Sequence, residues 1–181
     1  MKKIDKKRKC SVCEKEFVMM ESTTKVCSIS CALTYAREKN EAKEKKEVKA
    51  EIRKLKINLK TRSQWLRETQ TEFNKYIRLR DRDRPCISCG RHHNGQYHAG
   101  HYRSVGACPE LRFNENNCQK QCQPCNNHLS GNIVEYRLNL INRIGQQAVD
   151  DLESHHPPRK YTIDEIKELK RHYRAMAKGL T

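Results

Sequence analysis

Apolar residues recur at helical spacing along residues 36–84. The stripe consists of Val48, Ile52, Leu55, Leu59, Leu66 and Phe73. Successive members are separated by four, three, four, seven and seven positions, which is typical of one face of an amphipathic helix. The stretch holds neither proline nor glycine, so we predict that it is helical throughout. Its apolar stripe needs a partner, either a helix from the C-terminal region or a second copy of the chain.

Two shorter helices are predicted nearer the C-terminus. Asn132 and Glu135 form a capping-box pattern that opens a helix reaching about Ile144. Thr162 and Glu165 form the same pattern before a helix over 163–178. The intervening segment 155–158, His-His-Pro-Pro, breaks the chain.

Eight of the ten cysteines form four closely spaced pairs. One set is Cys10, Cys13, Cys27 and Cys31, and the other is Cys86, Cys89, Cys122 and Cys125. The chain shows neither a secretory leader nor an apolar run long enough to cross a membrane, so we expect a cytoplasmic protein. In a reducing compartment such pairs hold zinc more often than they form disulfides. We therefore predict two structural Zn²⁺ sites, with the remaining Cys108 and Cys118 as small buried apolar residues.

Only 35% of the residues are hydrophobic and 33% are charged, so the core must be small and supported by metal. The predicted fold class is α+β, small and zinc-stapled. We expect four segments: a zinc knuckle over 1–35, a basic helix over 36–84, a zinc-stapled core over 85–158 and a basic helix over 159–181.

The net charge of +16 indicates a polyanionic partner. Residues 36–84 hold 17 basic against 9 acidic side chains, whereas residues 85–158 hold six of each. Nucleic acid is the predicted partner. A membrane surface is not, because the basic helices lack a strongly apolar opposite face. The predicted DNA-binding residues are Lys43, Lys45, Lys46, Lys49, Arg53, Lys54, Lys56, Lys60, Arg103 and Arg112.

The neutral segment between the central cysteine pairs carries residues suited to phosphodiester hydrolysis. That reaction needs a base to activate water and a cation to stabilise the developing charge. His101 fits the base, since an unperturbed histidine has a pKa of about 6.5. The amide oxygen of Asn126 suits Mg²⁺ or Mn²⁺, and Asn117 can orient the base or its loop. His98 and His128 are candidates either for metal ligands or for structural hydrogen bonds.

This arrangement resembles the HNH nucleases, and a wider set of motifs resembles the Rap/NinG recombination endonuclease family of lambdoid phages over nearly the whole chain. The motifs are Cys86-Ile-Ser-Cys-Gly90, His98-Ala-Gly-His101-Tyr102, Arg112-Phe-Asn, Leu129-Ser-Gly-Asn132 and Tyr136-Arg. The resemblance implies a ββα-metal core, with His101 as base and Asn117 and Asn126 in the other two signature positions. It also implies cleavage of branched recombination intermediates, such as Holliday junctions and D-loops, and host or phage recombination proteins as partners.

One departure from that pattern keeps two other functions open. Gly100 stands where such nucleases place an aspartate, and His98 could replace the missing ligand only if a bulge at Gly100 turned both histidines to one face. A non-catalytic, zinc-dependent nucleic-acid-binding accessory factor is therefore the main alternative. A sequence-specific homing or restriction enzyme is the third. Two symmetric nicks would need two sites, so we also expect a homodimer.

Overall fold

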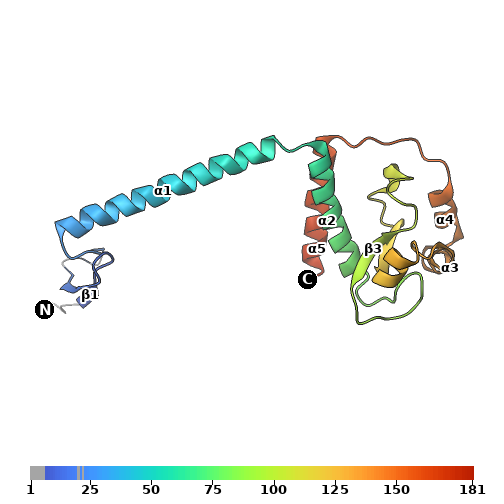
Figure 1. The fold of residues 1–181 in the computed structure, drawn as a ribbon, viewed down its shortest axis with the longest axis horizontal. Coiled ribbons are helices and arrows are strands. Elements are labelled where there is room, and N and C mark those ends of the chain that lie inside the picture. The colour runs from blue at the N-terminus through green and yellow to red at the C-terminus, as the bar shows by residue number, and fades with distance from the viewer. Residues whose placement is uncertain (1–6, 20, 22) are drawn as a thin grey trace. The chain divides into compact units, whose positions relative to one another are not determined.

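A computed structural model describes residues 7–19, 21 and 23–181, and the chain divides into two units, residues 1–60 and 61–181 (Figure 1). In the first unit, β1 (Lys7–Lys9) pairs antiparallel with β2 (Glu16–Val18). A long helix, α1 (Ile29–Asn58), follows, and Ser28 caps it by accepting a hydrogen bond from the backbone N–H of Cys31. No side chain of α1 is buried, so burial within its own unit does not stabilise this helix.

The uninterrupted helix predicted for residues 36–84 is wrong, because the chain forms two helices there. The first ends at Asn58, and the second, α2 (Arg62–Arg80), begins after Thr61. Thr61 and Gln64 form a capping box in which each side chain accepts a hydrogen bond from the other's backbone N–H. These bonds satisfy donors that a helix start leaves free, so a break is stabilised without proline or glycine.

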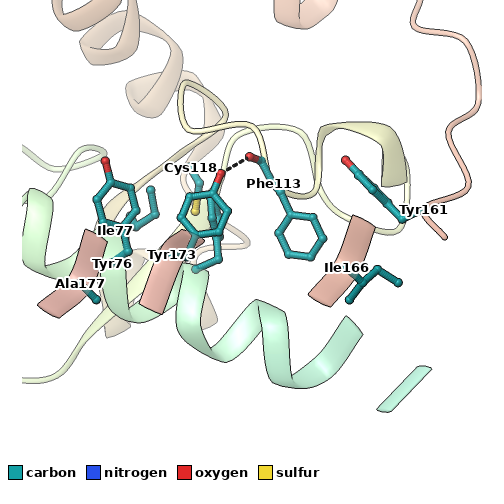
Figure 2. Packing of buried hydrophobic residues seen from close by; sticks show 9 residues of the cluster. Tyr76, Ile77, Phe113, Cys118, Tyr161, Ile166, Tyr173 and Ala177 are labelled. Carbon is teal, nitrogen blue, oxygen red and sulfur yellow. Dashed lines mark hydrogen bonds between the residues drawn. The ribbon is translucent and has the colours of Figure 1, made fainter. Parts of the chain in front are cut away.

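The main core of the second unit lies between α2 and the last helix, α5 (Ile163–Gly179), which run side by side (Figure 1). The C-terminal helix is thus the partner of the α2 part of the apolar stripe, the first of the two partners that the sequence left open. Phe73 and Ile77 of α2 are buried in this core, and the ring of Phe73 packs edge-on against Tyr173 of α5 with 4.8 Å between the ring centroids. The hydroxyl of Tyr173 donates a 3.0 Å hydrogen bond to the carbonyl of Phe113 (Figure 2). This bond ties the helix pair to the loop that precedes the second central strand.

A two-stranded hairpin lies between this helix pair and a smaller helical layer. Strands β3 (Tyr97–His101) and β4 (Cys118–Cys122) pair antiparallel, with His98 opposite Gln121 and His101 opposite Cys118. One face of the hairpin contributes Ala99 and Cys118 to the α2–α5 core. On the other side, Tyr136 of α3 (Ile133–Ile144) donates a 2.9 Å hydrogen bond to the carbonyl of Gly100.

Short elements complete the second unit. They are η1 (Pro109–Leu111), η2 (Pro124–His128) and α4 (Gln146–Glu153). Helix α3 has its predicted bounds, but the predicted capping box is wrong: Asn132 adopts a left-handed backbone with φ of 45° and its side chain makes no capping bond. The capping box of Thr162 and Glu165 at the start of α5 is confirmed. Within the described residues, every helix is too short or too polar to span a bilayer.

Candidate functional site

Both predicted cysteine sets come together in space. Within each set the four Sγ atoms lie within 4.8 Å of one another, and all ten cysteines are free of disulfides. The Sγ atom of Cys27 is 3.4 Å from that of Cys13 and 3.8 Å from that of Cys31, and the Cys89 and Cys122 Sγ atoms are 4.0 Å apart. Zinc–sulfur bonds of about 2.3 Å in a tetrahedron place sulfurs about 3.8 Å apart. The two clusters can therefore each hold a zinc ion.

Backbone N–H groups favour the thiolate form of one cysteine in each cluster. The N–H of Cys13 is the largest influence that lowers the pKa of Cys10 to about 6. Burial opposes ionisation of Cys86, but hydrogen bonds from the backbone of Cys122 and Cys89 bring its pKa below the usual value. Because zinc binds thiolates, these donors prepare Cys10 and Cys86 for the metal, whereas burial raises the pKa of Cys122.

Sequence reasoning missed a histidine beside the second cluster. His93 Nε2 lies 3.2 Å from Cys89 Sγ, and the backbone N–H of His93 donates to the Tyr97 hydroxyl at 2.6 Å. The Cys89-x3-His93 spacing is the signal that could have found it. The two unpaired cysteines behave as predicted: Cys108 and Cys118 are both buried among apolar side chains.

His101 is the last residue of β3, and a hydrogen bond to a backbone carbonyl orients its ring. Its Nε2 atom lies 3.0 Å from the carbonyl oxygen of Arg112, and its Nδ1 atom lies 3.7 Å from Cys118 Sγ. A carbonyl only accepts hydrogen bonds, so Nε2 carries the proton and Nδ1 keeps its lone pair. Burial of the ring is the main cause that lowers the pKa of His101 below 6.5. The side chain is therefore neutral at pH 7, with Nδ1 able to accept a proton.

Asn117 is fully buried and holds the loop that follows His101. Its Oδ1 accepts a 2.8 Å hydrogen bond from the backbone N–H of Arg103. Its Nδ2 donates to the carbonyls of Arg103 at 3.0 Å and Leu111 at 3.3 Å. These bonds fix the backbone on both sides of the loop, so Asn117 supports the position of His101 without touching its ring.

A cavity of about 450 Å³ brings His101 together with Asn126 and Gln121. Asn126 donates through Nδ2 to Asn127 at 2.6 Å, and its Oδ1 accepts no hydrogen bond from any described residue. Gln121 was missed by sequence reasoning. Its Nε2 donates to Ser88 Oγ at 2.6 Å and to the Gly131 carbonyl at 2.5 Å. No local pattern marks Gln121, because only the pairing of β4 with β3 brings its side chain against Gly100.

The other two histidines are not brought to this cavity's lining. His128 is exposed at the end of η2. The β3–β4 register is continuous from Tyr97 to His101, so there is no bulge at Gly100 and the His98 ring lies on the opposite face from His101. His98 Nε2 is nevertheless buried with no hydrogen-bond partner among the described residues.

Position 100 requires glycine because the side chain of Gln121 packs directly against it. A Cβ added at Gly100 would overlap the side-chain amide of Gln121, so an aspartate is not accommodated there. The amide of Gln121 thus occupies the space that the side chain of an aspartate at position 100 would need.

The predicted DNA-binding residues fall into two groups. Arg103 lines the cavity and Arg112 provides the carbonyl that holds His101. The others lie on α1 or just beyond it, where the helical residues are exposed: they are Lys43, Lys45, Lys46, Lys49, Arg53, Lys54, Lys56 and Lys60.

Comparison with known proteins gives one consistent family. A family model described as Bacteriophage Lambda NinG protein matches residues 1–181. Protein ninG of Escherichia phage lambda is 53% identical over 132 residues, which are 73% of this chain and 64% of the lambda protein. Protein ninG of Escherichia phage 933W is 42% identical over 96% of this chain and 94% of its own length. Protein ninG of Enterobacteria phage H19B is 44% identical over 91% and 89% of the two chains. No solved structure matches significantly.

These matches correct the resemblance drawn from the motifs. The identification with a Rap/NinG recombination endonuclease family of HNH type was wrong, because the matched family and relatives carry the NinG name alone and nothing among them indicates a Rap endonuclease or an HNH nuclease. The chain belongs to the bacteriophage lambda NinG protein family.

Proposed function

We propose that this protein is a metal-dependent endonuclease that hydrolyses phosphodiester bonds in branched DNA, with His101 as general base. The observation that carries the proposal is the hydrogen bond between His101 Nε2 and the Arg112 carbonyl. It fixes the ring and makes Nδ1, which lies 3.7 Å from Cys118 Sγ, the proton-accepting nitrogen of a residue that lines a cavity. A neutral histidine held in this way suits removal of a proton from water at pH 7.

The cavity also offers an oxygen ligand for a hard divalent ion. The side-chain amide oxygen of Asn126 belongs to the class of ligand that Mg²⁺ and Mn²⁺ accept, whereas the amide oxygen of Gln121 packs against Gly100. When bound, such an ion would supply charge stabilisation at the phosphate and the leaving oxygen. Asn117 keeps the loop of Arg103 in place, and Arg103 adds a cation to the cavity lining.

The proposed substrate is DNA with branches, such as Holliday junctions and D-loops, in the bacterial cytoplasm. The lysines of α1 are exposed point charges, which contact phosphates rather than base edges. A protein that grips the backbone in this way responds to the geometry of its substrate more than to its sequence. Replacing Lys43, Lys46 and Lys54 by alanine should weaken binding to all branched DNA and lower the salt slope by about 0.9 for each lost phosphate contact. An unchanged slope would remove α1 from the DNA interface.

One observation favours the alternative of a non-catalytic zinc protein that binds nucleic acid. The residues that line the cavity include no carboxylate, although carboxylates are the usual anchors of Mg²⁺ in proteins. The two functions can be distinguished by their product, because only the endonuclease cuts a DNA strand.

The deciding experiment uses full-length protein with end-labelled four-way junctions and a linear duplex of the same sequence. With Mg²⁺ or Mn²⁺ we expect cutting of the junction in preference to the duplex, and none with EDTA. Tight junction binding without cutting in either metal would instead establish the accessory function. Cutting of the linear duplex at a single site would indicate a sequence-specific enzyme.

A further inference from the structure

Helix α1 carries an apolar stripe that nothing in its own unit covers. Val48, Ile52, Leu55 and Leu59 are 55%, 46%, 56% and 78% exposed. Their spacing of four, three and four residues places them alternately at the two inner positions of a heptad repeat. Val48 and Leu55 take position d, and Ile52 and Leu59 take position a. A β-branched residue at a with leucine at d, as in Ile52 and Leu55, favours two strands.

We propose that α1 pairs in parallel with α1 of a second copy of this chain, forming a two-stranded coiled coil over 44–59. The charges that flank the stripe identify this occupant and its direction. In a parallel coil, position g of one helix lies beside position e of the following heptad of the partner. Those positions pair Glu44 with Lys49 and Glu51 with Lys56, so a symmetric dimer has four attractive contacts. None of these four side chains has an ion pair with any described residue of its own chain.

A shallow groove along α1 lies on the same seam. It is lined by Glu41, Glu44, Lys45, Val48, Lys49 and Ile52. On the heptad assignment every one of these residues occupies position a, d, e or g, the four positions that face a partner helix. The groove and the heptad repeat therefore lie on the same face of α1.

The antiparallel arrangement is disfavoured by the same charges. With Ile52 opposite Leu55 of an antiparallel partner, Lys49 would face Lys56, and Glu51 would face only the uncharged Asn58. Like charges in flanking positions oppose association, so the parallel direction wins. Lys45 at position a lies within the apolar seam, where a polar residue fixes the register at some loss of stability.

The dimer leaves a second face of α1 free. Lys43, Lys46, Arg53 and Lys54 occupy the outer positions b, c and f, so pairing does not cover them. The proposal does not rest on nuclease activity, because it follows from the apolar seam and its flanking charges alone.

Sedimentation equilibrium of the full-length protein over a concentration series tests the proposal. We expect the wild type to have twice the 21.4 kDa chain mass. The Glu44→Lys/Glu51→Lys variant should be monomeric, since each flanking contact becomes a repulsion between lysines. Mixing it with Lys49→Glu/Lys56→Glu, itself monomeric for the mirrored reason, should restore a dimer that contains one copy of each. This rescue shows that both variants remain folded.

Matched variants separate the seam from the rest of the helix. Leu55→Lys at position d should abolish the dimer, whereas Ile57→Lys at the outward position f should leave it intact, although both residues are apolar and exposed in one chain. A monomeric wild type overturns the proposal. So does a dimer that survives Leu55→Lys, and a dimer unaffected by Glu44→Lys/Glu51→Lys overturns the parallel direction.

Discussion

The Nε2 atom of His101 lies 3.0 Å from the carbonyl oxygen of Arg112, eleven residues further along the chain. The acceptor belongs to the loop that Asn117 holds through Arg103 and Leu111. The orientation of the histidine and the position of the loop are therefore coupled. A buried asparagine that never touches the His101 ring can still set the tautomer on which general-base chemistry depends.

Asn117→Ala should destabilise the protein and displace His101. The change leaves the backbone N–H and the carbonyl of Arg103 without their partner, and each unsatisfied buried group costs about 1–3 kcal/mol. We expect the free energy of unfolding in urea to fall by about 2 kcal/mol or more. Asn116→Ala, at the exposed neighbouring position, should change it little. Equal stability of the two variants would contradict the role assigned to Asn117.

Gly100→Ala should also destabilise the hairpin, because the added methyl group overlaps the amide of Gln121. Overpacking of this kind costs about 1–3 kcal/mol. Gly106→Ala is the matched control, since an added Cβ there has no atom within 4 Å and φ is not positive. Thermal unfolding of both variants by circular dichroism measures the difference. A Gly100→Ala midpoint as high as that of Gly106→Ala would show that Gln121 can move aside.

Stability should decrease in acid because of His101. Burial lowers the pKa of His101 in the folded protein below its usual value of 6.5, so the unfolded chain binds the proton more readily. Above pH 6.5 His101 is neutral in both the folded and the unfolded protein, so its contribution to the free energy of unfolding is complete. As the pH falls below 6.5 towards the folded-state pKa, the unfolded chain takes up the proton first and this contribution is lost. Urea unfolding of wild type and His101→Gln across this range should show a steeper loss in the wild type. Parallel curves would mean that His101 titrates normally.

The two cysteine clusters predict how much zinc the protein binds. Metal analysis of purified protein should find two zinc ions for each wild-type chain and one for Cys86→Ser or Cys10→Ser. Cys108→Ser should keep both ions, because Cys108 lies outside both clusters. Two zinc ions retained by Cys86→Ser would require another ligand, for which His93 beside Cys89 is the nearest candidate.

Local patterns predicted what local interactions determine. The cysteine spacings identified both ligand sets, since a CxxC pair places two thiolates at one metal whatever the rest of the fold does. Thr162 and Glu165 predicted the start of α5 for the same reason, because a capping box needs only four residues.

Features that depend on contacts between residues far apart in the sequence could not be predicted from it. The box pattern of Asn132 and Glu135 fails because the tight turn before α3 holds Asn132 in a left-handed conformation. Gln121 reads as an ordinary strand residue, and only the pairing of β3 with β4 places it against Gly100 and in the cavity with His101. The ligand shell of a catalytic ion depends on such contacts, which explains why His98 and His128 were weaker predictions than His101.

The most direct test of the central claim is the single-turnover rate of junction cleavage in Mg²⁺ or Mn²⁺ by wild type, His101→Ala and the surface control His155→Ala. Loss of a general base lowers such rates by about 100-fold or more. We predict that loss for His101→Ala and a wild-type rate for His155→Ala, with junction affinity and zinc content unchanged in both. Cleavage by His101→Ala at the wild-type rate would contradict the account.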